Sequence, residues 1–524
     1  MLKHVRQIPQ TVIQTYTERF NKQDEECYQN DIPNRAAADF LQNHIPLMEC
    51  SDKTLEEIYY FRWWTYRKHI KKTPEGYIIT EFLPDVPWAG AYNSINAANA
   101  HHIAEGRWLR NGAVYLEDYI RFWLHGTGLS RRYSTWLIAA VWDYCLLHND
   151  FSVGTENLDA MCAYYEQWED EHLEPCGMFW SIDNFDAMEY TISGTPLTVG
   201  TAAFHGGDKG FRPTLNSYMA ADAAAISRFA RLAGREELAD EYHRRAEALR
   251  KLINEKLWDG DFFKSFHCLD ENGSVSFRPM PKERNVRELI GYVPWCFALP
   301  YPGRETAFAY LKRAEGFENR YGMTTAEQNH PRFLFKAQHE CLWNGYIWPY
   351  ATAQTLTAMM QLLHGYDQTV INPHDFYAKL HQYAASQYRT DENGVRKPWI
   401  DEVIDPRNGE WYARQVLKDM GWLQQVGGYE RGKDYNHSTF CDLVLSGLAG
   451  LNPTADGKLI VDPLFAQNDL QYFCVEDVPC LGHTVSVYWD LDGTRYNMGV
   501  GLHVFCDDTK VASSHNLAKL VIQL

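Results

Sequence analysis

The chain has 524 residues, and its 50 Lys and Arg against 68 Asp and Glu give a formal net charge of −18. Phosphate binding requires a basic face, so this deficit argues against a nucleic-acid partner and against an anionic membrane surface. A hydrophobic fraction of 45% and an aromatic fraction of 14% are typical of a folded globular protein rather than a disordered one.

Helical periodicity dominates from about residue 54 to residue 450. Residues 135–147 leave no polar face, which predicts a helix buried on all sides. Residues 234–258 set apolar side chains at spacings of three or four opposite a charged face, which predicts a surface helix. Alternation of these two kinds predicts an inner and an outer ring of helices. The other predicted helices are 55–71, 114–124, 157–172, 216–232, 304–314, 350–363, 374–388 and 438–448.

After residue 452 the chain becomes β-rich, with short segments separated by Asp, Gly and Pro. Residues 484–489 alternate in polarity, which predicts a strand, and Asp492-Gly493 predicts a hairpin turn. The other predicted strands are 459–461, 472–475 and 502–505.

These patterns divide the chain into three parts. We expect an N-terminal extension over residues 1–54, a helical catalytic domain over 55–454, and a β-sandwich-like appendage over 455–524.

The twelve cysteines stand singly, without a C-x-x-C pair or a Cys/His cluster at zinc spacing, which argues against a disulfide framework and a structural zinc site. The N-terminal segment has no apolar stretch of signal-peptide length, and no apolar run approaches the roughly 20 residues of a membrane span. We therefore expect a cytoplasmic protein with no membrane partner.

The run from Trp180 to Glu189 carries the carboxylates of Asp183, Asp186 and Glu189 beside aromatic rings. Crowded acids next to apolar rings allow one carboxyl pKa to be raised while another stays low, as acid–base catalysis requires. A turn in which Asp183 and Asp186 cap backbone amides is the simpler alternative.

Residues 397–409 bring Asp401, Glu402 and Asp405 close to Trp399 and end in an Asp-Pro turn. A loop that carries a carboxylate beside tryptophan rings suits a sugar site. Solvated acids around the turn are the alternative.

In residues 340–349, Trp343 and Trp348 flank Asn344 and Gly345. Aromatic planes with a side-chain amide fit the apolar face of a sugar and its hydroxyl groups. Packing at the start of a helix is the competing interpretation.

Polar residues before the second predicted helix form another candidate wall. His101 and Glu105 are four residues apart and would share a helix face. A third metal ligand is not evident, so the pattern favours a polar pocket wall built with His102 and Arg107, next to Trp108.

Residues 434–439 add His437 as a pocket candidate. Asn436 and Ser438 in the same segment are suited to capping the helix that follows.

Together these segments resemble the six-hairpin glycosidases, and among them glycoside hydrolase family 63, the mannosylglycerate and glucosylglycerate hydrolases and the trehalases. Asp183-Asn184 matches the end of an E-S-G-x-D-N phrase whose aspartate is the general acid in the family. The matches to the W-x-G-x-x-W-P and E-x-x-D-P-x-x-G phrases are Trp343, Gly345, Trp348 and Pro349, and Glu402, Asp405, Pro406 and Gly409.

Two departures stand inside these phrases. Phe179 replaces the glutamate that precedes the acid, and Asn344 replaces the arginine of W-R-G. The usual arginine after the acid is also absent. These positions bind substrate in relatives, so the resemblance implies a different specificity here.

The resemblance implies an (α/α)6 toroid with a small C-terminal β domain, and hydrolysis of a small α-linked glycoside with inversion. It implies Asp183 as the general acid, with Asp186 as its rival, Glu402 as the general base, and Trp180 among the rings that desolvate the acid. No cofactor or metal is expected, because two carboxylates and a water suffice. The expected partner is a small carbohydrate, and the oligomeric state is open, a homo-oligomer included.

Three alternatives stay open. A rhamnosidase-like or arabinosidase-like enzyme would use the same fold. A polysaccharide lyase on a helical toroid would use His101, Tyr190 and Arg212. A non-catalytic sugar-binding protein would keep the aromatic rings without needing both acids.

Overall fold

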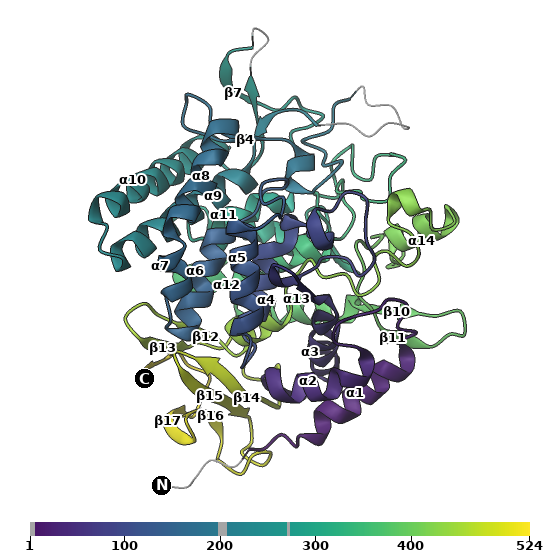
Figure 1. Ribbon diagram of the computed structural model, residues 1–524, viewed down its shortest axis with the longest axis vertical. Helices are drawn as coiled ribbons and strands as arrows, with labels where there is room; N and C mark the ends of the chain where they lie inside the picture. The colour runs from purple at the N-terminus through teal and green to yellow at the C-terminus, as the bar shows by residue number, and fades with distance from the viewer. Residues whose placement is uncertain (1–5, 198–206, 270–272) are drawn as a thin grey trace.

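The computed structural model describes residues 6–197, 207–269 and 273–524. Helices fill the upper body of the molecule, and the C-terminal strands lie at its lower end beside the N-terminal helices (Figure 1). The α-helices are α1 Thr11–Gln23, α2 Ala37–His44, α3 Lys53–Tyr66, α4 Asn99–Gly106, α5 Ala113–His125, α6 Leu137–His148, α7 Ser152–Glu156, α8 Leu158–His172, α9 Pro213–Leu232, α10 Glu236–Leu252, α11 Val293–Cys296, α12 Pro349–Gly365, α13 Pro373–Ser386 and α14 Tyr412–Asp419.

Both predicted kinds of helix occur. Helix α6 is buried along most of its length, as its unbroken apolar sequence predicts. Helix α10 buries one stripe, which includes Tyr242 and Leu249, and exposes its charged face. Helices α9 and α12 begin with a proline at the first turn, where the missing N–H leaves no hydrogen bond unmade.

Three predicted helical segments take other helical forms. Residues 304–314 form a 3₁₀ stretch, η8 Glu305–Lys312, and the end of the 234–258 segment is a π-turn, η6 Ile253–Leu257. Residues 438–448 end in a π-helix, η10 Leu443–Leu448. Within η10 the Ser446 hydroxyl donates to the carbonyl oxygen of Asp442 at 2.6 Å, and such a bond competes with the α-helical backbone pattern.

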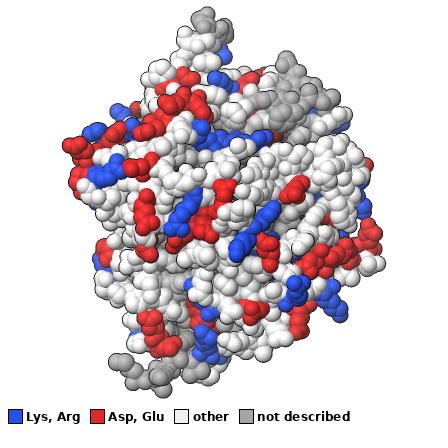
Figure 2. All heavy atoms as spheres, in the orientation of Figure 1, with Lys and Arg blue, Asp and Glu red and all other residues white. Residues whose placement is uncertain are grey.

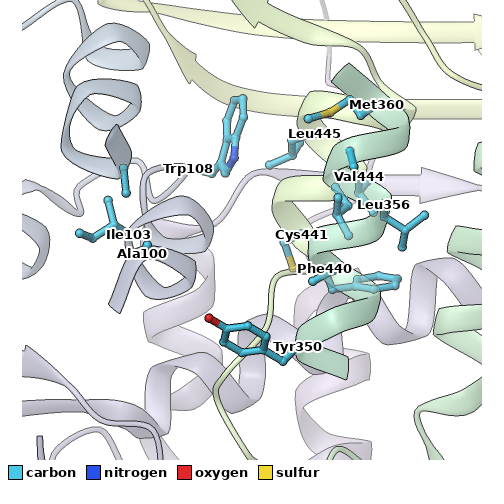
Figure 3. Close-up of a cluster of buried hydrophobic side chains, with 14 of the residues drawn as sticks. Ala100, Ile103, Trp108, Tyr350, Leu356, Met360, Phe440, Cys441, Val444 and Leu445 are labelled. Carbon is cyan, nitrogen blue, oxygen red and sulfur yellow. The ribbon is translucent and has the colours of Figure 1, made fainter. Parts of the chain in front are cut away.

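Seven of the helices contact one another in succession. Helix α4 packs on α6, α6 on α9, α9 on α11, α11 on α12, α12 on α13, and α13 on α3. Figure 3 shows apolar side chains gathered between α4, α12 and the segment around η10, among them Trp108, Leu356 and Val444. The centre of the helical part is therefore packed with side chains.

The C-terminal strands form an antiparallel sheet that also takes in an N-terminal strand. Its order is β1-β14-β15-β16-β17, and Leu47 of β1 lies opposite Glu476 of β14. The buried Glu476 carboxylate also accepts the backbone N–H of Gln7 at 2.7 Å and of Ile8 at 3.3 Å. The five strands are β1 Leu47–Cys50, β14 Tyr472–Cys480, β15 His483–Asp490, β16 Gly501–Cys506 and β17 Thr509–Ser514.

The predicted strands are present, but the predicted hairpin is not a tight one. Asp492-Gly493 lies within the longer connection 491–500 between β15 and β16. The tight turns of the sheet are Leu481-Gly482 and Asp507-Asp508, where positive φ values match the twist of the flanking strands.

Smaller sheets complete the described chain. A three-stranded sheet, β12-β13-β18, adjoins the end of the helical part, and a four-stranded sheet, β4-β5-β6-β7, follows α8. The remaining strands are β2 Ile70–Thr73, β3 Gly76–Ile79, β4 Trp180–Ser181, β5 Gly210–Phe211, β6 Phe266–Leu269, β7 Val275–Pro279, β8 Glu318–Asn319, β9 Gly322–Met323, β10 Tyr388–Thr390, β11 Arg396–Pro398, β12 Leu451–Pro453, β13 Lys458–Val461 and β18 Leu520–Gln523.

On the face shown in Figure 2, the blue side chains of Lys and Arg are interspersed with the red side chains of Asp and Glu. Within the described ranges, no helix is long and apolar enough to cross a membrane.

Candidate active site

Loops around the helical part line an open cavity of about 260 Å³. Its wall combines four glutamates with the buried guanidinium of Arg431, a concentration of charge that a packed core does not tolerate without function or pairing. The glutamates are Glu81, Glu189, Glu340 and Glu402, and the aromatic residues of the wall are Phe82, Trp88, Tyr133, Trp348 and Tyr435.

Glu402 reaches the cavity because two of the sequence motifs pair with each other. The backbones of Ile347 and Ile404 exchange hydrogen bonds of 3.0 and 2.8 Å, which brings the loop of Glu402 beside the tryptophan motif. Glu402 is 1% exposed. Its Oε1 accepts from Arg431 Nε at 2.6 Å, and its Oε2 accepts from the Cys341 thiol at 3.2 Å.

Arg431 joins two carboxylates of the wall. Its Nη1 donates to Glu340 Oε1 at 2.8 Å while its Nε binds Glu402. A Cβ on Gly427 would come within 2.4 Å of Arg431 Cδ, so the close approach of the backbone there requires glycine. The guanidinium is thereby fixed between Glu340 and Glu402.

Glu189 differs from Glu402 in its electrostatics. Burial raises its pKa to about 8, and the neighbouring carboxylates of Asp183, Glu402 and Glu340 add to the shift. Glu189 therefore carries its proton at neutral pH, while Glu402 is ion-paired to Arg431. A proton-bearing carboxyl and an ion-paired carboxylate in one cavity are the two groups that acid–base catalysis requires.

Asp183 lies in the 3₁₀ turn η5 Asp183–Asp186 and is fully buried outside the described lining of the cavity. Burial raises its pKa to about 7. A Cβ on Gly207 would come within 2.2 Å of its Oδ1, so the Gly207 backbone packs directly on the carboxylate. The left-handed backbone of Ala187 (φ 54°) and Tyr190 (φ 63°) turns the chain, and Glu189 rather than Asp183 reaches the described wall.

Asp186 is bonded on both oxygens and also lies outside the described lining. Arg212 Nε donates to its Oδ2 at 2.5 Å, and both residues are buried. The hydroxyl groups that also donate to it belong to Ser134 (2.7 Å), Ser181 (3.2 Å) and Thr214 (2.6 Å). Asp186 therefore fixes the loop of η5 in place.

Asp401 is buried next to Glu402 but is not in the described lining. Its pKa is raised to about 7, first by burial and then by the Glu402 carboxylate. It accepts the Glu402 N–H at 2.8 Å and the Trp399 Nε1–H at 3.3 Å. Trp399 therefore supports the loop from behind.

The tryptophan motif supplies one ring to the wall and one behind it. Trp343 and Trp348 stack with their centroids 4.3 Å apart, and Trp348 is the ring in the described lining. Asn344 donates to the carbonyl oxygen of Phe335 at 2.7 Å, and Gly345 takes a φ of 125° that favours glycine. Asn344 and Gly345 thus shape the loop.

The histidines predicted for a polar wall lie deeper, on α4. The ring of His101 contacts that of Tyr350 edge-on at 4.7 Å, and its pKa falls to about 3 because burial disfavours the imidazolium ion. His102 binds Tyr119 at 2.8 Å and the carbonyl oxygen of Asn436 at 2.5 Å. Helix α4 is buried on nearly every side, and neither histidine is part of the described lining.

The other members of that predicted wall stabilise the chain before η10. Glu105 accepts the backbone N–H groups of Phe440, Cys441 and Asp442. Arg107 Nη2 and Trp108 Nε1 donate to Asp442 Oδ1 at 2.7 and 2.8 Å. None of the three lines the cavity described here.

Neither Trp180 nor His437 enters the described lining of the cavity. Trp180 is half-buried beneath Lys209, whose Nζ lies 3.7 Å from the ring centroid. His437 stacks at 3.8 Å on Tyr435, which does face the cavity.

The residues suggested for a lyase are not assembled in the described wall. Arg212 is ion-paired to Asp186, Tyr190 lies against the ring of His339 at 5.2 Å, and His101 lies on α4.

Among the charged and thiol-bearing residues of the described wall, the sequence reasoning gave no role to Glu81, Arg132, Glu340, Cys341 or Arg431, and it named Glu189 only as the third carboxylate of the acidic run. Glu189 closes the acidic run, and Glu340 opens the tryptophan motif, so position beside a motif was a usable signal for both. No spacing marks Glu81 or Arg431, which come from segments that meet only in the fold.

The described site can be compared with known proteins. The family model of the mannosylglycerate hydrolase MGH1-like glycoside hydrolase domain matches residues 91–438. A solved structure titled "Sialidase" is similar with a TM-score of 0.87 and 35% identity, over 98% of this chain and 45% of that one. This chain therefore spans less than half the length of that relative. None of the curated proteins matches.

Two further solved structures are more distant. A glycoside hydrolase family 63 mannosylglycerate hydrolase from Thermus thermophilus, in complex with glucose, has a TM-score of 0.47 and 12% identity over 70% of this chain and 99% of that one. An alpha-L-rhamnosidase from Dictyoglumus thermophilum has a TM-score of 0.48 and 13% identity over 85% and 43%. The match to the family model covers well over half of the chain, so this chain belongs to the family of mannosylglycerate hydrolase MGH1-like glycoside hydrolase domains.

Proposed function

We propose that this glycosidase hydrolyses a small α-linked glycoside with inversion of configuration, using Glu189 as the general acid and Glu402 as the general base. The observation that carries the proposal is the presence of both carboxyls in one cavity wall, one with a pKa of about 8 and the other ion-paired to Arg431. The proposal takes the acid's role from Asp183 and gives it to Glu189, and it keeps the predicted base.

In the proposed reaction, Glu189 donates its proton to the glycosidic oxygen as the bond to the anomeric carbon breaks. Glu402 takes a proton from a water that attacks the opposite face of the ring. An inverting pair needs roughly 6.5–9.5 Å between the carboxyls to admit that water. The Trp348 ring offers an apolar plane for the sugar.

We also propose that the helices form an (α/α)6 toroid. The succession of contacts from α4 through α6, α9, α11, α12 and α13 to α3 supports a ring of helices. The amphipathic helix α10, which packs on α9, fits an outer ring.

The acid and the base can be separated by the choice of leaving group. A 2,4-dinitrophenolate leaves without protonation, so Glu189→Gln should retain activity on a dinitrophenyl glycoside and lose roughly 10²–10⁴-fold on a sugar leaving group. Glu402→Gln should lose activity on both. ¹H NMR of the first-formed anomer tests inversion.

Asp183→Asn is the matched comparison. We expect it to hydrolyse both classes of substrate at a ratio close to that of the wild type. If Asp183→Asn shows the leaving-group dependence and Glu189→Gln does not, the acid is Asp183. Retained configuration in the first product would overturn the inverting mechanism.

A further inference from the structure

Glu81 is a cavity residue that the proposed reaction does not use. It lies just beyond β3 and is 5% exposed, and it lines the same wall as Glu189 and Glu402. Its Oε1 accepts a hydrogen bond from the Tyr435 hydroxyl. Its Oε2 has no hydrogen-bond partner among the described residues. A buried carboxyl oxygen without a partner is costly unless a ligand or water completes it.

The position of this carboxyl is fixed from both sides. The Asn436 N–H donates to the carbonyl oxygen of Glu81 at 3.1 Å, which joins the two segments. The Tyr435 ring packs between the rings of Phe82, at 4.6 Å, and His437, at 3.8 Å. Tyr435 therefore holds one oxygen of Glu81 and leaves the other for a partner.

The surroundings of Glu81 favour the protonated form. Its pKa is raised to about 8, first by burial and then by the carboxylates of Glu402 and Glu189, against the opposing effects of Tyr435 and Arg431. Because Oε1 already accepts a hydrogen bond, the proton belongs on Oε2, which makes that oxygen a donor. Among the described residues, Glu81 also acts electrostatically on the phenols of Tyr119, Tyr133 and Tyr350, and Arg132 and His339 line the same cavity.

We propose that Glu81 determines specificity by hydrogen-bonding one hydroxyl group of the sugar ring through Oε2. This inference rests on the proposed function, since it places the ring that is cleaved in this cavity. It defines the substrate class at that position as a neutral ring with a hydroxyl group there. A ring with a carboxylate in that place would face Glu81, Glu189 and Glu402, and a deoxy ring would leave Oε2 unpaired.

A series of monodeoxy glycosides tests this proposal. The series derives from whichever glycoside the wild type hydrolyses, and kcat/KM is measured for wild type and for Glu81→Ala. One deoxy analogue should be about 10- to 100-fold worse than its parent for the wild type. For Glu81→Ala, kcat/KM for the same analogue should be no lower than for its parent, because the carboxyl that binds the hydroxyl group has been removed. The other analogues should show equal losses in both proteins.

Glu81→Gln is the second variant and keeps the shape of the side chain with one donor and one acceptor. We expect it to keep the discrimination, because its amide N–H can donate to the same hydroxyl group from the position of Oε2. Glu392→Gln, at an 85% exposed side chain, is the control and should match the wild type throughout.

Equal discrimination by wild type and Glu81→Ala on every analogue would overturn the inference and leave the proposed function standing. If the wild type turns over no glycoside, the proposed function fails first, and calorimetry with glucose, mannose and rhamnose decides the inference instead. At least one of the three should bind the wild type about 10- to 100-fold more tightly than it binds Glu81→Ala. No binding, or equal binding, would reject the role of Glu81.

Discussion

The buried carboxylates around η5 and those of the cavity wall differ in how completely the protein bonds them. Asp186 receives hydrogen bonds from Arg212 and from three hydroxyl groups. Among the described residues, one carboxyl oxygen of Glu81 in the wall has no hydrogen-bond partner. The second oxygen of Glu402 accepts a hydrogen bond from the Cys341 thiol alone in that part of the chain. A carboxylate whose lone pairs are filled by its own chain has nothing left for a substrate. Incomplete bonding therefore distinguishes Glu81 and Glu402 of the wall from Asp186 in the loop of η5.

The largest effect should come from Glu402→Gln, compared with Asp401→Asn. The amide keeps the volume of Glu402 but cannot take a proton from water, so kcat should fall by roughly 10²–10⁴-fold at unchanged thermal stability. Asp401→Asn retains an acceptor for the Glu402 N–H and should retain most of the activity. Kinetics of both variants on one substrate make the comparison. A dead Asp401→Asn beside an active Glu402→Gln would reverse the assignment.

Asp186→Asn should lower the stability of the fold without changing the chemistry of the cavity. It leaves the buried guanidinium of Arg212 without its ion-pair partner, so the free energy of unfolding should fall by about 3 kcal/mol. The folded fraction should keep its kcat, because Asp186 lies outside the described cavity wall. Urea denaturation gives the stability, and adding Arg212→Met should restore part of it. A variant with normal stability and no activity would show that Asp186 takes part in the reaction.

The two stacked tryptophans provide a graded test. Trp348 lines the cavity and Trp343 lies behind it, so Trp348→Ala should weaken substrate binding by about 1–3 kcal/mol through lost stacking area. Trp343→Ala should lower stability more than it raises KM. KM is obtained for both variants from initial rates over a range of substrate concentrations. Equal KM values in the two variants would show that the two stacked rings contribute to binding together.

The pH dependence of kcat should report Glu189. Its pKa is raised to about 8, so the acid form that the reaction needs is present below that pH and is lost above it. The rate should therefore fall about tenfold per pH unit above pH 8. Glu81→Gln should retain this decline, because that substitution leaves Glu189 in place. A kcat that stays level to about pH 10 would remove Glu189 from the acid's role.

The smallest effect should come from the thiol beside the base. Cys341 Sγ donates to Glu402 Oε2 at 3.2 Å, and Cys341→Ala removes that donor while Cys341→Ser supplies a hydroxyl. We expect kcat to fall about fivefold for alanine, the equivalent of about 1 kcal/mol, and less for serine. Equal kcat values in all three proteins would show that the thiol only fills space.

Periodicity was sufficient to find most of the helices, because helices such as α6 and α10 follow the apolar pattern residue by residue. The motif spacing around Glu402 also led to a residue of the wall. The proposed acid could not be predicted from the pattern. Three carboxylates stand within one run, and the left-handed backbone of Ala187 and Tyr190 turns the chain where Glu189 reaches the described wall. Backbone turns of this kind leave no periodic pattern in the sequence from which they could be predicted.

Residues on the same helix face were a second limit. His101 and Glu105 do lie on one helix, α4, as their spacing predicts. When a helix is buried on nearly every side, its polar residues can face either a cavity or the packed interior. The sequence does not distinguish these two environments. Glu105 caps the chain before η10, while His101 packs against aromatic rings.

The pairing of β1 with β14 sets a waiting time for the nascent chain. Strand β1 can meet β14, and Gln7 can meet the Glu476 carboxylate 469 residues away, only after the intervening residues have been made. At roughly 5–20 residues per second, the N-terminal segment spends at least about 20 seconds on the ribosome before its partner strand emerges. During that interval the unpaired edge of β1 and the apolar stripe of α1 are exposed to aggregation and to chaperones. Pairing of β1 with β14 therefore joins two segments that are made far apart in time.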